Sequence, residues 1–222
     1  MTELAAARLR LAARLFAYPS GEFFNALAQM RGLENALDKP MAYALLNFSQ
    51  RLLTAGPAET CQRYVAIFDH TPGASLYLTW HRYGNDRSQG KAMAALNGLY
   101  RTAGFEPIPG EMPDYLPRML EFLSVAPDWA IEALLDGFGP ELNQLLATLQ
   151  ALGSDHAPIL ALALEPLKQA WPDRFEPRTG PDPTRRPMAQ PETEQLEPLI
   201  PVPGASGKSL KEAASLLKKT GA

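Results

Sequence analysis

The sequence predicts an all-α protein: a single helical-bundle domain followed by a proline-rich C-terminal tail. Three observations lead to this prediction. Apolar residues recur at helical spacing, beginning with Leu4, Ala7, Leu11 and Leu15. The alternating pattern that is typical of strands is absent, and β-branched residues are scarce. Composition then shifts sharply after Trp171, where prolines become frequent.

The first third of the chain is predicted to hold four helices. A residue before proline disfavours helical geometry, serine is a preferred N-cap, and proline is tolerated in the first turn of a helix. On this basis the first helix ends before Tyr18-Pro19, the second is capped by Ser20, the third opens at Pro40 and stops at Gly56-Pro57, and the fourth spans residues 58–68.

Four further helices are predicted in the rest of the domain. A glycine just past the last helical residue is a common C-terminal signal, and Gly104 is placed to end the first of the four. The expected helices cover residues 86–103, 114–124, 128–152 and 157–170, which bounds the folded domain at residues 1–171.

The remaining residues are predicted to form two different segments. Residues 172–206 hold nine prolines and few large apolar residues, so they are expected to be a disordered linker. Residues 207–222 favour a short basic amphipathic helix, because Ser209 and Glu212 form a capping box. Its role stays open between a lipid surface, a partner and plain solvent exposure. Its apolar face would carry Leu210, Ala213, Ala214 and Leu217.

Composition excludes several classes of protein. The net charge of −3 and pI near 5.7 argue against nucleic-acid binding. The single cysteine, Cys61, allows neither an intrachain disulfide nor a CxxC pair. No apolar run is long enough to span a bilayer, and the arginine-rich start lacks a signal-peptide cleavage site. The expected protein is cytoplasmic, without stable membrane insertion.

Catalytic and metal-binding patterns are also missing from the sequence. The three histidines, His70, His81 and His156, do not match a metal-ligand spacing. Neither a GxSxG elbow nor a phosphate-binding glycine loop is present. Cys61 lies among apolar residues and is interpreted as a structural thiol. We therefore expect no enzymatic activity, no metal and no cofactor.

An aromatic segment between two longer helices has two interpretations. Tyr77, Trp80 and His81 are spaced so that they share one face of a helical turn. They form either part of the core or a partly exposed wall of the kind at which peptides dock, since tyrosine and tryptophan offer large contact areas.

The acidic segment at residues 111–117 also has two interpretations. Pro113 keeps the residue before it extended, and Asp114 is placed to cap the helix that follows. Alternatively, Glu111, Asp114 and Glu121 form an acidic rim suited to a ligand that carries arginine or lysine.

Four stretches of the chain stand out together: YVAIFD, SLYLTWHRYGNDRSQGKAM, LYRTAGFEP and EMPDYLPRMLEFL. In this order they resemble the nitrate reductase delta-subunit (NarJ) family, within the wider TorD/DmsD-like group of redox-enzyme maturation chaperones. The resemblance covers residues 8–170. Trp80, Asn85 and Gln89 depart from the family pattern, in which many members carry Tyr, Asp and Arg.

The resemblance implies a non-enzymatic cytoplasmic chaperone of all-helical fold. Its partner would be the apo catalytic (alpha) subunit of nitrate reductase, bound through the N-terminal peptide. The chaperone would support molybdenum cofactor insertion before membrane attachment. The peptide-binding residues that the resemblance nominates are Glu111, Pro113, Asp114 and Tyr115, with Tyr77, Trp80 and His81 as a second wall.

Three other functions stay open at this point. A stable structural subunit would co-purify with mature reductase, and a large exposed apolar face would favour it. An enzyme acting on the cofactor would turn over a nucleotide or a pterin. A chaperone for a DMSO- or TMAO-type reductase would differ only in its client.

Overall fold

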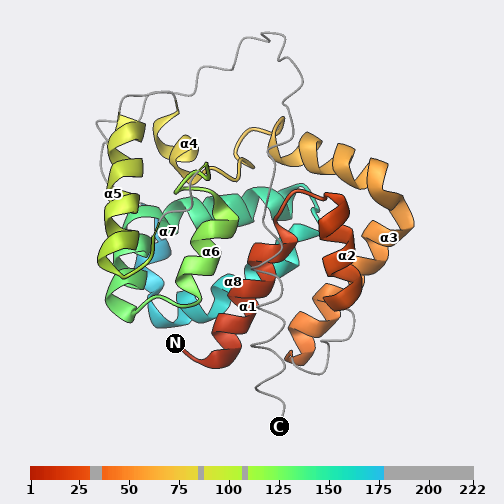
Figure 1. The fold of residues 1–222 in the computed structure, drawn as a ribbon, viewed down its shortest axis with the longest axis horizontal. Coiled ribbons are helices and arrows are strands. Elements are labelled where there is room, and N and C mark those ends of the chain that lie inside the picture. Colours follow the sequence, from red (N-terminus) through yellow and green to blue (C-terminus); the bar gives the residue numbers. More distant parts are fainter. Residues whose placement is uncertain (31–36, 85–87, 107–109, 178–222) are drawn as a thin grey trace. The chain divides into compact units, whose positions relative to one another are not determined.

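The computed structural model describes residues 1–30, 37–84, 88–106 and 110–177, and these residues form helices (Figure 1). Within them the only β-structure is an isolated antiparallel bridge between Tyr77 and Tyr115. The predicted all-α class is confirmed, whereas the predicted segments beyond residue 177 lie outside the described part. The helices are α1 (Glu3–Leu15), α2 (Gly21–Met30), α3 (Lys39–Phe68), α4 (Leu78–Tyr83), α5 (Ser88–Thr102), α6 (Leu116–Leu123), α7 (Asp128–Ala151) and α8 (His156–Ala170), followed by the 3-10 turn η2 (Pro172–Phe175).

Most of the predicted helix ends are confirmed. Ser20 accepts a hydrogen bond from the Phe23 amide (3.3 Å) and so caps α2. Gly104 adopts φ +88° just after α5, a conformation that costs glycine little. The predicted start of α6 is wrong: the helix begins at Leu116, and Tyr115 occupies its N-cap position.

The core lies where α1 packs against α6 and α8, and α7 packs against α8 (Figure 1). Each of these helices turns an apolar face inward, and their central side chains are removed from solvent. Burial of this kind contributes about 1.5–3 kcal/mol for each large side chain. The side chains that are fully buried here include Leu9, Phe16, Met119, Leu120, Leu142, Leu145, Leu160 and Leu164.

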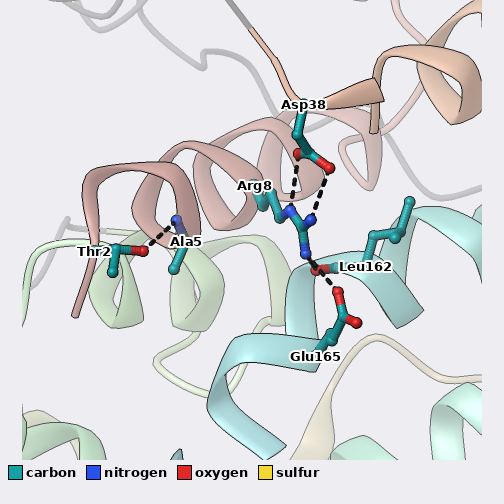
Figure 2. Close-up of polar contacts among 6 residues, drawn as sticks. All are labelled: Thr2, Ala5, Arg8, Asp38, Leu162 and Glu165. Atoms are coloured by element: carbon teal, nitrogen blue, oxygen red, sulfur yellow. Dashed lines mark hydrogen bonds and ion pairs between the residues drawn. The ribbon is translucent and has the colours of Figure 1, made fainter. Parts of the chain in front are cut away.

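Arg8 on α1 joins three segments of the chain. Its guanidinium donates two hydrogen bonds to the Asp38 carboxylate (3.0 and 2.7 Å), at the N-cap of α3. A third nitrogen donates to Glu165 (2.6 Å) and to the Leu162 carbonyl (3.2 Å), both on α8. Figure 2 shows the guanidinium between these partners. At the start of the same helix, Thr2 accepts from the Ala5 amide and caps α1.

Helix α3 consists of two helical halves that meet at Gly56. Gly56 has φ +78° and ψ 169°, and Pro57 follows it. Because proline cannot complete the helical hydrogen-bond pattern and glycine tolerates positive φ, the chain bends at this point. The two arms are visible in Figure 1, and the predicted break at Gly56-Pro57 is confirmed.

His156, the first residue of α8, lies in an aromatic cage. The centroid of its ring is 4.9 Å from those of Phe16 and Phe48, 5.0 Å from that of Phe68 and 6.4 Å from that of Tyr64. Burial lowers the pKa of His156 to about 4, although a hydrogen bond to the Leu15 carbonyl favours the protonated form. The imidazole is therefore neutral in the folded protein at physiological pH.

The buried histidine predicts a specific loss of stability in acid. The unfolded chain binds a proton at His156 below about pH 6.5, whereas the folded protein binds it only near pH 4. Stability should therefore be unaffected above pH 6.5 and fall by about 3 kcal/mol as the pH drops to 4. Urea unfolding from pH 7.5 to 4.5 checks this. A His156→Gln variant should show a shallower decline, and parallel curves would contradict the assignment.

The folded part extends past the predicted boundary at residue 171. The η2 turn packs on α7 and α8, Phe175 is buried, and the Asn143 side chain donates to the Phe175 carbonyl (3.4 Å). The predicted linker therefore begins too early, because an aromatic residue four positions beyond Trp171 finds a place in the core. Gly139 of α7 packs against this turn: a Cβ at this position would overlap the Arg174 carbonyl oxygen.

A methyl group at position 139 should displace η2. We expect Gly139→Ala to lower the free energy of unfolding by about 1–3 kcal/mol, the usual effect of overpacking. Gly137, two residues earlier on α7, has open space around the position that a Cβ would take. Gly137→Ala should be neutral or stabilising by up to about 1 kcal/mol, because alanine favours helix. Equal effects of the two substitutions in urea unfolding would contradict this.

Candidate functional site

The aromatic and acidic segments are brought together by backbone pairing. The Leu78 amide donates to the Asp114 carbonyl (3.0 Å), and the Leu116 amide donates to the Leu76 carbonyl (2.8 Å). These two bonds flank the Tyr77–Tyr115 bridge, and the two tyrosine rings lie 5.4 Å apart between centroids. The segments before α4 and α6 therefore form one unit, although 35 residues separate Thr79 from Asp114 in the chain.

Asp114 positions the start of α4. Its carboxylate accepts from the Thr79 amide (3.1 Å) and from the Thr79 hydroxyl, and the side chain is completely buried. The Thr79 hydroxyl in turn accepts from Gln89 of α5 (3.1 Å). Both sequence interpretations of Asp114 are thus corrected: it caps α4 rather than α6, and its burial removes it from an exposed acidic rim.

The rest of the acidic segment is held from α5 and α6. The Tyr100 hydroxyl donates to the Pro113 carbonyl (2.6 Å), and burial raises the pKa of Tyr100. Arg118 donates to the Glu111 carbonyl (3.1 Å), and its guanidinium lies 5.2 Å from the centre of the Tyr100 ring. Glu121, the third residue of the expected rim, pairs with Arg14 of α1 (3.1 Å).

A pocket of about 280 Å³ opens between α4, α5 and the segment before α6. We call it the Trp80 pocket. Tyr77, Trp80 and Met112 are 45%, 36% and 41% exposed, so large apolar side chains face solvent around it. A second oxygen of Asp114 is buried without a hydrogen-bond partner among the described residues. The lining residues are Ser75, Tyr77, Trp80, Gln89, Met93, Met112 and Asp114.

The pocket is lined by only some of the predicted site residues, and Glu111 and Pro113 are not among them. Tyr77, Trp80 and Asp114 line the pocket, and Tyr115 packs against Tyr77. His81 does not line it: its Nε2 lies 2.7 Å from the Ser75 carbonyl, and burial lowers its pKa, so the neutral ring donates this bond.

Sequence reasoning missed four residues that line the Trp80 pocket. Gln89 and Met93 stand four positions apart on α5 and therefore face the pocket together. The four-residue spacing could be recognised within the helix expected at residues 86–103. The sequence did not indicate which segments lie opposite these two side chains in the pocket. The other two missed residues are Ser75 and Met112.

The side chains of the Trp80 pocket offer a surface for binding another molecule, not a set of catalytic groups. Among the described residues, no group of three or more His, Cys, Asp or Glu side chains could hold a metal ion. Nor does any helix in these residues have the length and apolar character needed to cross a membrane. The methionines are adaptable contact surfaces, and tyrosine and tryptophan add rigid ones.

These features define the class: an all-helical domain with an open pocket of aromatic and methionine side chains on a hydrogen-bonded frame. The family model described as "Nitrate reductase delta subunit" matches residues 34–158, more than half of the chain. The chain belongs to the nitrate reductase delta-subunit family.

Curated relatives agree with this membership. The chain is similar to the nitrate reductase molybdenum cofactor assembly chaperone NarJ of Escherichia coli K12, at 34% identity over 71% of this chain and 68% of that protein. It is also similar to the probable NarJ chaperone of Bacillus subtilis, at 28% identity over 69% of this chain and 84% of the relative. A nitrate reductase-like protein NarX of Mycobacterium tuberculosis matches 56% of this chain at 34% identity, over 19% of its own length.

Proposed function

We propose that this protein is a cytoplasmic chaperone for the maturation of respiratory nitrate reductase. It acts by binding rather than by catalysis: it holds the apo catalytic subunit through the N-terminal peptide and supports insertion of the molybdenum cofactor before membrane attachment. The names of the relatives, which are nitrate reductase molybdenum cofactor assembly chaperones, support the client and the role.

The observation that carries the proposal is the Trp80 pocket. An amphipathic helix binds by inserting apolar anchors into a groove, and tyrosine, tryptophan and methionine are enriched where such anchors dock. Tyr77, Trp80 and Met112 each leave much of their surface open to solvent. Large apolar side chains that are exposed side by side typically mark a binding site. A client side chain that enters the pocket would cover this surface.

The frame around the pocket supports binding at low entropic cost. Tyr77 and Tyr115 are fixed by the backbone bridge, and Asp114 fixes the first turn of α4. Because the walls are ordered before the client arrives, less conformational freedom is lost on binding. Met93 and Met112 can still adjust their rotamers to the anchor that enters.

A maturation assay tests the function. A strain that lacks its own nitrate reductase chaperone would express either this protein or its Trp80→Ala variant, and the molybdenum content of the purified reductase would be measured. We expect the unmodified protein to restore cofactor loading and the variant to restore much less. Trp129→Ala, which removes a tryptophan that is 50% exposed on α7, is the control and should behave like the unmodified protein. Failure of the unmodified protein to restore loading would contradict the proposal.

A further inference from the structure

Gln89 adds an unused hydrogen-bond acceptor to the lining of the Trp80 pocket. It is the second residue of α5, and its side-chain nitrogen donates to the Thr79 hydroxyl (3.1 Å). Within the described part of the chain, no group donates a hydrogen bond to the other end of the amide, the oxygen Oε1. A purely apolar client side chain in the pocket would leave this oxygen without a partner.

The neighbouring hydrogen bonds determine the orientation of the Gln89 amide. The Asp114 carboxylate only accepts, so the single proton of the Thr79 hydroxyl is donated to Asp114. The Thr79 oxygen then has lone pairs to offer and no proton, and the amide group that can meet it is the NH2 of Gln89. The Gln89 nitrogen is therefore committed to Thr79, and its oxygen remains available to a group that enters the pocket.

Gln89 is also the acceptor that a client can reach. One oxygen of Asp114 lacks a partner too, but this residue exposes no surface to solvent, whereas Gln89 is partly exposed. The Ser75 hydroxyl already accepts from the Tyr77 amide (3.2 Å). The residues that line the pocket include no arginine, lysine or histidine, so the charged side chains of the pocket supply no donor to Gln89.

The remaining walls of the pocket favour an aromatic guest. Tyr77 and Trp80 leave much of their rings open to solvent, and aromatic rings attract one another in offset and edge-to-face arrangements. Met93 and Met112 add sulfur atoms, which make favourable contacts with ring edges. The volume of about 280 Å³ is close to the roughly 300 Å³ at which ligand pockets begin, so one aliphatic side chain would not fill it.

We propose that Gln89 determines the specificity of the Trp80 pocket. Its Oε1 accepts a hydrogen bond from an aromatic client side chain that carries a donor at its edge, as tyrosine and tryptophan do. The inference rests on the proposed function, because it names the side chain by which the client is held. A site that hydrogen-bonds a polar group of its ligand discriminates against the analogue without that group, since the acceptor is then left unpaired.

Titration calorimetry with the N-terminal peptide of the catalytic subunit tests the inference in two steps. An alanine scan of the peptide identifies the side chain that enters the pocket, because its removal weakens binding to the unmodified protein but not to Trp80→Ala. That position is then occupied by tyrosine in one peptide and by phenylalanine in another. We expect the unmodified protein to bind the tyrosine peptide about fivefold more tightly, the usual effect of one hydrogen bond.

The ratio of the two dissociation constants is the decisive quantity. Gln89→Met has a similar length but lacks the acceptor, so the preference for tyrosine should disappear. Gln89→Glu retains an acceptor oxygen and should retain the preference. The matched control is Gln62→Met, which changes an exposed glutamine of α3 and should bind both peptides as the unmodified protein does. If Gln89 only supported the fold, its substitution would weaken both peptides equally and leave the ratio unchanged.

The outcomes separate this inference from the proposed function. Equal binding of the tyrosine and phenylalanine peptides to the unmodified protein would overturn the inference, and so would a preference that persists in Gln89→Met. In both cases the peptide still binds at the Trp80 pocket, and the proposed function stands. If the unmodified protein binds none of the peptides, the inference falls together with the proposed peptide site. Circular dichroism of each variant confirms that it remains folded.

Discussion

Replacing Arg8 with alanine should lower the free energy of unfolding by about 2–4 kcal/mol, because a partly buried ion pair and the hydrogen bonds of its guanidinium are lost together. The guanidinium is buried and donates to two carboxylates and one carbonyl oxygen. Its removal leaves Asp38 without its bidentate partner and the Leu162 carbonyl without a donor (Figure 2). Contacts between α1, α3 and α8 would weaken together.

Urea unfolding followed by circular dichroism measures this effect, and Arg10→Ala is the matched control. Arg10 pairs with Glu3 on the surface of the same helix (2.7 Å), so its removal should change the free energy of unfolding by less than about 1 kcal/mol. Similar effects of the two substitutions would show that the Arg8 contacts do not hold the helices together. The hydrogen bonds from Arg8 lower the pKa of Asp38, so their contribution is present above the ordinary aspartate pKa and is lost as the pH falls through the lowered value.

The second large effect is expected at Asp114. Asp114→Ala removes the acceptor of the Thr79 amide and hydroxyl inside a buried site. We expect a loss of about 2–4 kcal/mol in the free energy of unfolding, which combines a lost helix cap with buried donors left unpaired. Because the first turn of α4 carries Trp80, binding of the client peptide should be lost as well.

Asp114→Asn separates the hydrogen bonds that this side chain accepts from the charge that it carries. An asparagine oxygen can accept the same two hydrogen bonds, so we expect less than half of the alanine effect on stability. Peptide affinity should then follow stability: it should be largely retained in the asparagine variant and lost in the alanine variant. Equal loss of peptide binding in two variants of different stability would instead assign the charge of Asp114 a direct part in binding.

The helices could be predicted from the sequence because their signals are local. Periodic leucines, the Ser20 cap, the Gly56-Pro57 break and Gly104 act within a few residues. The start of α6 could not be predicted in the same way. Asp114 stands where an N-cap of α6 is expected, but its carboxylate accepts hydrogen bonds from Thr79 instead. Only the tertiary pairing of the two segments determines which helix Asp114 caps.

The candidate site could be predicted only in part, because some of its signals are local and others depend on tertiary contacts. Tyr77, Trp80 and Asp114 stand in recognisable stretches, and the structure places all three around one pocket. The burial of Asp114 and the internal hydrogen bond of His81 depend on neighbours that are distant in the chain.

We propose above that the Trp80 pocket binds the N-terminal peptide of the nitrate reductase catalytic subunit. The most direct test is titration calorimetry of that peptide into the unmodified protein, Trp80→Ala and Trp129→Ala. We expect micromolar or tighter binding by the unmodified protein and by Trp129→Ala, and about 30-fold weaker binding by Trp80→Ala. Binding that is unchanged in Trp80→Ala, or absent from the unmodified protein, would contradict it.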